Sequence, residues 1–286
     1  MPPYRYVLAD VFTDRAYGGN QLAVLPDSAG LDEAQMHAIA REFNLSETTF
    51  VTPGSAPDHF RVRIFTPGGE LPFAGHPIVG TAIALRHLGR VTEACIFDLK
   101  IGPVRVEVVS DRATFHRDGA PEIRAVQLPA DQIAALVGAP ALAGEAFEAG
   151  YGTAFLYIPL ADRAAVAAAR LRRDLWERAA PMLWGRGVYV HAVSAPRDGV
   201  TPVHARMFGT GLGVIEDPAT GSAAAGLAGS LPGPEGLHRI AITQGVEMGR
   251  PSLIEATATR VDGQVHAITI GGGAVVVGEG RLIRVP

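Results

Sequence analysis

Two turns in the chain place a reactive side chain directly after a glycine and before a run of small residues. His76 follows Gly75, and Ser222 follows Gly221. Each run has the composition of a buried helix, and the start of a helix offers free backbone N–H groups and a partial positive charge. Two such starts facing each other would bind a carboxylate or stabilise an enolate-like intermediate. The alternative is that His76 and Ser222 only cap their helices.

One glutamate offers acid–base chemistry. Glu47 lies where a predicted helix gives way to a strand, with Leu45 and Phe50 nearby. A carboxylate in a partly apolar pocket has a raised pKa and can act as base and acid in turn. The alternative is a solvated loop glutamate, which is the usual environment of this residue type.

A second carboxylate, Asp217, precedes the second of the two turns. It would pair with a histidine or hold a substrate amine at the start of the helix. The alternative is that the pair Asp217-Pro218 only initiates a turn. For two further residues, Arg206 and Tyr151, the sequence is equally compatible with lining a cleft and with packing in the core.

Several common kinds of catalytic site lack their sequence signature. No two of the nine histidines have the spacing H-E-x-x-H or another metal-ligand spacing, and the single Cys95 excludes a multi-cysteine metal site. Neither G-x-S-x-G nor G-x-G-x-x-G occurs in the chain. Lys100 is the only lysine, so there is no P-loop, and pyridoxal phosphate chemistry is set aside. Hydrolase, nicotinamide-dependent and metal-enzyme hypotheses therefore lack their signatures.

The composition is that of a globular protein without a strongly charged surface. Hydrophobic residues make up 48% of the 286 residues and charged residues 19%, which is too apolar for a disordered chain. A net charge of -4 gives no general electrostatic hold on nucleic acid or on an anionic membrane. We therefore expect a small-molecule substrate and neither a nucleic-acid nor a membrane partner. The opening residues lack the pattern of a signal peptide, which predicts a cytoplasmic protein.

The hydrophobic pattern predicts many strands and a few helices. Residues 59–66 alternate like a strand, for example, whereas residues 77–88 have the character of a compact helix. Such a mixture favours an α+β fold over alternating βαβ units. The turn-rich residues 118–122 are the candidate domain boundary, which gives one domain over 1–118 and another over 119–274.

The second half of the chain repeats part of the first half. A shift of 146 residues aligns segment 70–85 with segment 216–231, and both fit the pattern E-x-P-x-x-G-x-x-x-x-G-x-A-x-x-L. In both segments a Pro/Gly turn opens a small-residue helix at the same point. Gly, Ala and Leu are common in this chain, but the match favours a duplicated domain over chance.

Three ordered motifs resemble those of the phenazine-biosynthesis isomerase-like (PhzF-like) family. They are Asn44-Leu-Ser-Glu-Thr-Thr-Phe-Val51, Glu70-Leu-Pro-Phe-Ala-Gly-His-Pro77 and Glu216-Asp-Pro-Ala-Thr-Gly-Ser222. The segments Asp10–Asn20 and Gln244–Pro251 are similar to the family as well. The resemblance therefore covers nearly the whole chain.

The resemblance implies a diaminopimelate-epimerase-like fold. In that fold two pseudo-symmetric domains each wrap a curved, mostly antiparallel sheet or barrel around a central helix, and the active site lies between the domains. The final strand, about 275–286, is then expected to return to the first domain. Family members are commonly homodimers and need no cofactor. The related epimerases use two cysteines, which the single Cys95 excludes here.

The resemblance also assigns roles to individual residues. By motif matching it carries over three catalytic residues, Glu47, His76 and Asp217, and four substrate-binding residues, Gly75, Gly221, Ser222 and Asn20. The chain departs from the family pattern at Gln21 and Thr210, where the family often has proline. Both positions border the predicted site, so the departures bear on the exact substrate more than on the type of reaction.

The activity implied by the resemblance is isomerisation of trans-2,3-dihydro-3-hydroxyanthranilate, a step toward phenazines, by proton transfer on Glu47. A second hypothesis keeps the fold and Glu47 but takes another amino-acid-like metabolite as the substrate of an isomerase or epimerase. A third hypothesis is a non-catalytic ligand-binding protein on the same scaffold. Replacing Glu47 by glutamine separates these, because a binding protein would keep its affinity whereas an enzyme would lose turnover.

Overall fold

The chain forms two compact units. The computed structural model describes residues 4–210 and 215–286. Unit 1 comprises Met1–His116 together with Gly271–Pro286, and unit 2 comprises Arg117–Ile270. The chain leaves unit 1 within strand β8 and returns to it within strand β17. The predicted domain boundaries, after residues 118 and 274, stay a prediction, because compactness alone does not define a domain.

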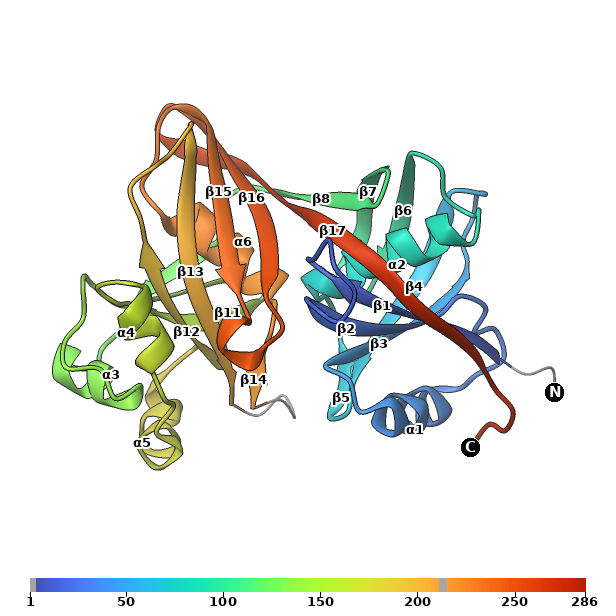
Figure 1. The fold of residues 1–286 in the computed structure, drawn as a ribbon, viewed down its shortest axis with the longest axis horizontal. Coiled ribbons are helices and arrows are strands. Elements are labelled where there is room, and N and C mark those ends of the chain that lie inside the picture. Colours follow the sequence, from blue (N-terminus) through green and yellow to red (C-terminus); the bar gives the residue numbers. More distant parts are fainter. Residues whose placement is uncertain (1–3, 211–214) are drawn as a thin grey trace. The chain divides into compact units, whose positions relative to one another are not determined.

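Each unit is built mainly of strands (Figure 1). Unit 1 contains, in chain order, β1 (Tyr4–Val11), β2 (Asn20–Leu25), α1 (Glu33–Phe43), β3 (Glu47–Pro53), β4 (His59–Thr66), β5 (Gly69–Leu71), α2 (Gly75–His87), β6 (Ala94–Leu99) and β7 (Gly102–Val109). Unit 2 contains β9 (Glu122–Ala125), α3 (Ala130–Leu136), β10 (Phe147–Tyr151), β11 (Thr153–Pro159), α4 (Arg163–Ala168), α5 (Arg173–Ala179), η1 (Ala180–Met182), β12 (Gly187–Val193), β13 (Val200–Gly209), β14 (Glu216–Asp217), α6 (Gly221–Ser230), β15 (Gly236–Gln244), η2 (Val246–Met248) and β16 (Ser252–Val261). The connecting strands are β8 (Arg112–Asp118) and β17 (Gln264–Leu282).

The strands of unit 1 close into a ring. Neighbours pair in the order β17, β1, β2, β3, β4, β6, β7 and β8, and β8 pairs with β17 again. The pairs β2–β3 and β4–β6 are parallel, because a helix connects the two strands in each case. The pairs β1–β2, β3–β4 and β6–β7 are antiparallel. Unit 1 is therefore a small closed barrel.

Helix α2 is enclosed by this barrel. It contacts β1, β2, β3 and β7, and its residues from Gly75 to Leu85 are all buried. A helix that is apolar all round is expected to be buried, and only small residues let strands approach it closely. A Cβ atom at Gly80 would lie 2.6 Å from side-chain carbons of both Leu22 and Val11. Glycine at position 80 is therefore required by the approach of the strands.

Unit 2 repeats the order of strand pairing seen in unit 1. The pairs β11–β12 and β13–β15 are parallel, whereas β10–β11, β12–β13 and β15–β16 are antiparallel. A short strand, β5 or β14, precedes the central helix in each unit. Helix α6 takes the place of α2, and all of its residues from Gly221 to Gly229 except Ser222 are buried. The same plan has thus been built twice.

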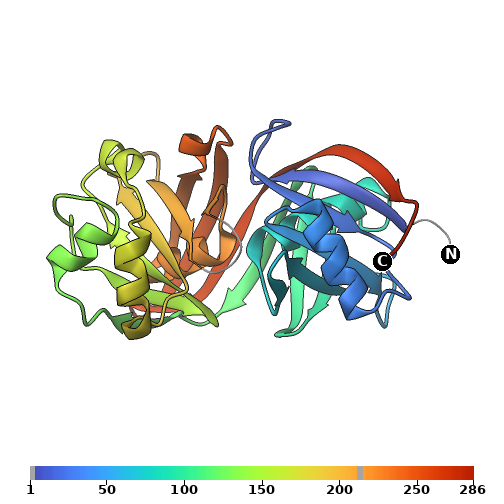
Figure 2. The same cartoon turned by 90° about the horizontal axis from the view of Figure 1, so that it is seen from below.

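The other helices pack away from the two central helices. In unit 1, α1 packs on β2, β3 and β4 through a cluster that includes Met36, Ile39 and Phe50. In unit 2, α3, α4 and α5 pack together on β11 and β12 around Trp176. Figure 2 shows these three helices, in green to yellow, gathered on one side of the unit 2 strands. Each sheet therefore has a helix on both faces.

The predicted α+β class with two similar units is confirmed by this repeated plan. The strands of each unit are joined in the same order, and both central helices begin at the turns that the repeat aligns. Among the described residues, no helix is both long enough and apolar enough to cross a membrane.

Replacing Gly226 by alanine is expected to lower the free energy of unfolding by about 1–3 kcal/mol. Gly226 of α6 is the repeat partner of Gly80, and a Cβ atom there would collide with the hydroxyl oxygen of Tyr157. That hydroxyl donates to the main-chain oxygen of Ala223 over 2.8 Å, so moving it also breaks a buried hydrogen bond. Urea unfolding is the measurement. A matched Gly144→Ala variant, where the nearest atom would be 3.7 Å away, should change stability by less than about 0.5 kcal/mol.

Candidate active site

Three residues that the sequence singled out lie together in unit 1. Glu47 is the first residue of β3, Asn20 is the first residue of β2, and His76 is the second residue of α2. Nε2 of His76 lies 3.2 Å from Oε2 of Glu47. Nδ1 of His76 lies 3.1 Å from the amide nitrogen of Asn20. The imidazole therefore connects the amide to the carboxyl group.

Local structure explains how Glu47 reaches this place. Helix α1 ends at Phe43, and the left-handed backbone of its C-cap residue Asn44 turns the chain back toward the sheet. Strand β3 then begins, paired in parallel with β2, with Glu47 opposite Leu22. The Glu47 side chain is only 14% exposed. The alternative of a solvated loop glutamate is therefore wrong.

Burial keeps the His76 ring neutral. Desolvation lowers the pKa of His76 to about 3, against a smaller opposing contribution from a hydrogen bond with the backbone of Gln21. At neutral pH the ring carries one proton, which sits on Nδ1 or on Nε2. A neutral ring does not lock Glu47 into a fixed ion pair. A carboxyl group beside a neutral imidazole is an arrangement compatible with proton transfer.

The N-cap residue of each central helix makes no side-chain capping hydrogen bond. That residue is Ala74 for α2 and Thr220 for α6. The interpretation of His76 and Ser222 as capping residues is therefore wrong, and each is the second residue of its helix. The first-turn N–H groups, including those of the buried Gly75 and Gly221, keep the partial positive charge that favours an anion.

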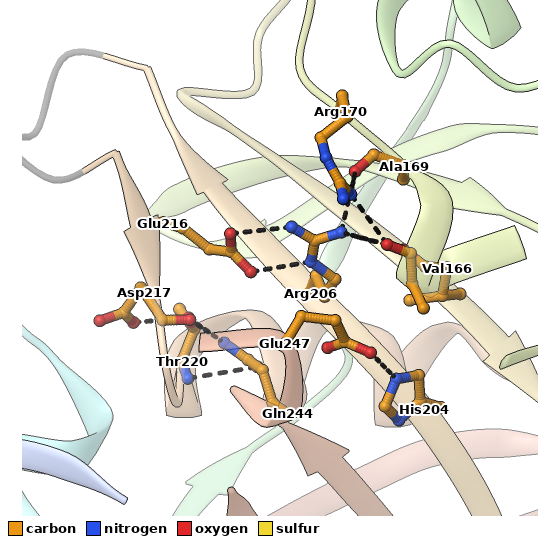
Figure 3. Close-up of polar contacts among 11 residues, drawn as sticks. Val166, Ala169, Arg170, His204, Arg206, Glu216, Asp217, Thr220, Gln244 and Glu247 are labelled. Atoms are coloured by element: carbon orange, nitrogen blue, oxygen red, sulfur yellow. Dashed lines mark hydrogen bonds and ion pairs between the residues drawn. The ribbon is translucent and has the colours of Figure 1, made fainter. Parts of the chain in front are cut away.

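In unit 2, hydrogen bonds hold Asp217 in place (Figure 3). Asp217 ends the short strand β14, and its side chain is buried. The hydroxyl of Thr220 donates to Oδ2 of Asp217 over 2.6 Å. The amide nitrogen of Gln244 donates to the main-chain oxygen of Asp217 over 2.8 Å and to the Thr220 hydroxyl over 3.0 Å. The Thr220 hydroxyl thus holds the carboxylate, and Gln244 holds the backbone of Asp217 and that hydroxyl.

Gln244 uses every hydrogen-bonding position of its amide. Its Oε1 accepts from the hydroxyl of Tyr189 over 3.2 Å and from the backbone N–H of Thr220 over 3.4 Å. Burial, followed by the charge of Asp217, raises the pKa of Tyr189 well above its usual range, so the phenol remains a donor. A buried network whose members are all satisfied holds a single arrangement.

Arg206 and Tyr151, whose roles the sequence did not decide, both form hydrogen bonds to other residues of unit 2. Arg206 is buried, forms two hydrogen bonds to Glu216, and donates to main-chain oxygens at the end of α4. The Tyr151 hydroxyl donates to the main-chain oxygen of Gly119 over 2.8 Å. Packing is therefore the role that these contacts support for both residues.

The predicted site residues fall into one group in each unit. Asn20, Glu47, Gly75 and His76 belong to unit 1, and Asp217, Gly221 and Ser222 belong to unit 2. Sequence reasoning missed the residues that hold Asp217. Gln244 had been noticed only as the first residue of a motif, and Tyr189 carried no signal because its partner is distant in the chain. The unit 1 group offers proton transfer, and the unit 2 group offers a carboxylate beside a helix start.

Thiolate and metal chemistry find little support in the described residues. No group of three or more His, Cys, Asp or Glu side chains that could hold a metal ion occurs in residues 4–210 and 215–286. Cys95 lies buried on β6, and burial, followed by the charge of Asp58, raises its pKa to about 12. Cys95 therefore remains a thiol. The expectation that the reaction needs no cofactor stays a prediction.

Comparison with known proteins gives the family. The model of the family described as phenazine biosynthesis-like protein matches residues 9–280. The chain belongs to this family. A relative from Mesorhizobium japonicum, named as an uncharacterized isomerase, is 42% identical over 99% of both chains. The trans-2,3-dihydro-3-hydroxyanthranilate isomerase of Pseudomonas aeruginosa is 35% identical over 97% of this chain and 99% of its own.

A solved structure supports the same assignment of fold. The crystal structure of a PhzF-family phenazine biosynthesis protein from Bacillus anthracis superposes with a TM-score of 0.88 at 22% identity, covering 99% of this chain and 100% of the other. The predicted diaminopimelate-epimerase-like fold is thus confirmed. This member of the phenazine biosynthesis-like family is an isomerase, as its relatives are. The hypothesis of a non-catalytic binding protein is set aside.

Acid should destabilise the protein partly through His76. Its pKa is about 3 in the folded chain and 6.5 when exposed, so between these values the unfolded chain binds a proton that the folded chain does not. Stability is therefore lost as the pH falls from 6.5, by up to about 1.4 kcal/mol per pH unit. A His76→Gln variant should show a flatter fall of unfolding free energy between pH 6.5 and pH 4. The exposed His116→Gln variant should follow the wild type, and equal slopes for both variants would contradict this account.

Removing the Thr220 hydroxyl should weaken catalysis through Asp217. A hydrogen bond to a charged group contributes about 1.5–3 kcal/mol, so Thr220→Val is expected to lower kcat/KM by about 10- to 100-fold. Thr220→Ser keeps the hydroxyl and should stay within about threefold of the wild type. The assay uses the substrate of the Pseudomonas aeruginosa relative. Full activity of the valine variant would show that Asp217 does not depend on this anchor.

Proposed function

We propose that this protein isomerises trans-2,3-dihydro-3-hydroxyanthranilate, or a closely similar small cyclic amino acid, by acid–base proton transfer on Glu47. The observation that carries the proposal is the 3.2 Å approach of Glu47 to a neutral His76. It occurs in a family that has a member named for this reaction. Sequence motifs match Glu47 to the family's catalytic carboxylate.

The proposed reaction moves one proton. Glu47, as a carboxylate, takes the proton from C3 of the substrate, and the electron pair of the broken C–H bond enters the conjugated system. Glu47, now protonated, gives a proton to another ring carbon and returns to its starting state. No electron is gained or lost, so no oxidant or reductant is needed. Proton transfer of this kind contributes about 10²–10⁴-fold to the rate, and orientation adds more.

His76 and Asp217 are proposed to bind the polar substituents of the ring. A neutral imidazole can donate one hydrogen bond and accept another, which suits a hydroxyl group or a tautomerising enol. The carboxylate of Asp217, already oriented by Thr220, would accept from the substrate amine. Asn20 would hold the His76 ring in place through its contact with Nδ1.

The substrate carboxylate is proposed to lie at the start of a central helix. Ser222 is partly exposed and would donate its hydroxyl. The N–H groups of Gly221 and Gly75 would add directional donors without a charged side chain. The absence of side-chain caps on both helices supports this role, because a cap would compete for the same N–H groups.

A second candidate function keeps the mechanism and changes the substrate. The Mesorhizobium japonicum relative is named an isomerase without a substrate, and Gln21 and Thr210 depart from the family pattern beside the predicted site. These observations favour another amino-acid-like metabolite as the alternative. The family resemblance also supports a homodimer in the cytoplasm that works without a cofactor, and these features belong to the proposal.

The first test is turnover of trans-2,3-dihydro-3-hydroxyanthranilate by purified protein without added metal or cofactor. The wild type should consume the substrate, followed by ultraviolet absorbance, and should introduce deuterium at a ring carbon in deuterated water. Glu47→Gln should lose at least about 10²-fold in kcat, because the amide cannot carry the proton. Substrate affinity should change little.

A matched control keeps this test specific. Glu42→Gln alters an exposed carboxylate of α1 in the same unit and should leave kcat unchanged. Normal turnover by Glu47→Gln would refute the proposed mechanism. An inactive wild type that is folded would reject this substrate, and deuterium exchange into related cyclic amino acids would then test the second candidate.

A further inference from the structure

An arginine, a phenylalanine and a glutamate form a compact arrangement in unit 1. Nε of Arg63 donates to Oε1 of Glu70 over 2.7 Å, and Nη2 donates to Oε2 over 2.6 Å. The guanidinium carbon lies 5.0 Å from the centre of the Phe65 ring. Two parallel hydrogen bonds between planar groups are stronger and more directional than a single contact. We name the Arg63–Glu70 pair brace 1.

The same arrangement occurs in unit 2, and Figure 3 shows its Arg206–Glu216 pair. Nε of Arg206 donates to Oε1 of Glu216 over 2.8 Å, and Nη2 donates to Oε2 over 2.9 Å. The guanidinium carbon lies 4.8 Å from the centre of the Phe208 ring. The same atoms pair in the same way, and each arginine lies over the phenylalanine two residues further along its strand. We name the Arg206–Glu216 pair brace 2.

The two glutamates occupy matching places in the backbone. Glu70 of β5 lies opposite Phe65 of β4, and Glu216 of β14 lies opposite Phe208 of β13. In both units the central helix begins five residues after the glutamate. Each brace therefore attaches the start of the loop that leads into a central helix to the neighbouring long strand, β4 in unit 1 and β13 in unit 2.

Short strands make such an attachment necessary. β5 has three residues and β14 has two, so each forms few hydrogen bonds with its neighbour. A backbone hydrogen bond contributes only about 0.5–1.5 kcal/mol net. A strand this short would therefore fray without a further contact. The brace supplies one at the point where the chain leaves the sheet for the helix.

Each brace also ties the loop to an outer helix. Nη2 of Arg63 lies 2.6 Å from Oε2 of Glu33, in the first turn of α1. Nη1 of Arg206 donates to three main-chain oxygens at the end of α4, over 2.8–3.2 Å. Lys100 adds a second cation to Glu70. The short strand, the neighbouring strand and the outer helix are thus held at one point.

Both braces are largely shielded from water. The Glu70 side chain is 6% exposed in brace 1, and the Arg206 side chain is 5% exposed in brace 2. Breaking a shielded pair by removing one charge is costly, because the other charge is left without its partner. Burial alone would raise the pKa of Glu70, but hydrogen bonds from Arg63 and Lys100 outweigh it and lower the pKa. The Glu70 carboxylate is therefore ionised at neutral pH.

We propose that brace 1 and brace 2 are equivalent positioning pairs, each of which fixes the loop between a short strand and its central helix. In unit 1 that loop leads to His76, and in unit 2 it begins with Asp217, the neighbour of Glu216 in the chain. Neither brace needs to touch the substrate, since each acts by placing those two residues. The effect on catalysis rests on the proposed function, whereas the effect on the loops does not.

Paired Glu70→Gln and Glu216→Gln variants test the proposal, because glutamine keeps the shape and removes the charge. Nuclear magnetic resonance relaxation of the Gly75 and Gly221 N–H groups reports order at the two helix starts. Glu70→Gln should lower the order parameter of Gly75 from about 0.85 toward about 0.6 and leave Gly221 unchanged. Glu216→Gln should do the reverse. A role in general stability alone would not produce this separation.

Turnover gives the second readout. Each variant should lose about 10- to 100-fold in kcat, because a small misplacement of catalytic groups has this effect, while KM changes less than about twofold. In the double variant the two losses should multiply, since the braces lie in different units. Glu122→Gln removes the carboxylate of an exposed ion pair with Arg124 in unit 2 and serves as the control with unchanged kcat. If a glutamine variant does not fold, it is replaced by Glu70→Asp or Glu216→Asp. Aspartate keeps the negative charge, but its shorter side chain cannot make both hydrogen bonds to the arginine in the same geometry.

The outcomes separate this proposal from the proposed function. Unchanged order at both glycines in folded variants would overturn the positioning role, and so would unchanged kcat in variants whose helix starts are disordered. A wild type that does not turn over the substrate would overturn the proposed function only. The relaxation measurement would still decide whether the braces fix the helix starts.

Discussion

The structure depends on enclosing a helix within a strongly curved set of strands, once in each unit. An enclosed helix has no free side, because every face meets a strand, and glycine is needed where the approach is closest, as at Gly80 and Gly226. The only part of such a helix that a ligand can reach is an end. This constraint explains why the candidate chemistry gathers at the first turns of α2 and α6, where His76 and Ser222 hold the same position.

Burial then decides how charge is handled around these turns. A buried imidazole stays neutral, so His76 lies beside Glu47 without a positive charge, as the proposed proton transfer requires. Asp217 is oriented by neutral partners, the Thr220 hydroxyl and the Gln244 amide. Full charge pairing is instead used in the two braces, where rigidity is required and no proton has to move. Under the proposed function, the groups that react are thus separate from the groups that only hold the backbone.

Much of this plan could be predicted from sequence, and the failures have physical causes. The fold class and the family were predicted from the duplicated turn and from three motifs, and both are confirmed. Capping by His76 and Ser222 was wrong, because both helices begin one residue earlier, at Gly75 and Gly221, so that the N-cap residues are Ala74 and Thr220. The braces were missed because Arg63 and Arg206 are offset by 143 residues whereas their glutamates are offset by 146. A shift of 146 residues therefore aligns the two glutamates but does not align the two arginines.

Duplication offers a way to understand which positions are alike in the two units and which differ. The positions that hold the backbone are the same in both: a braced glutamate, a proline, and a glycine at the start of the helix. The positions beside them differ, with His76 matched to Ser222 and Leu71 matched to Asp217. Identical reactive groups in the two units would suit a reaction that needs the same chemistry on both sides of the substrate. Here one unit carries a carboxyl group beside an imidazole, and the other carries a hydroxyl and an oriented carboxylate. This difference supports the proposed proton shift, in which one group both removes and returns the proton.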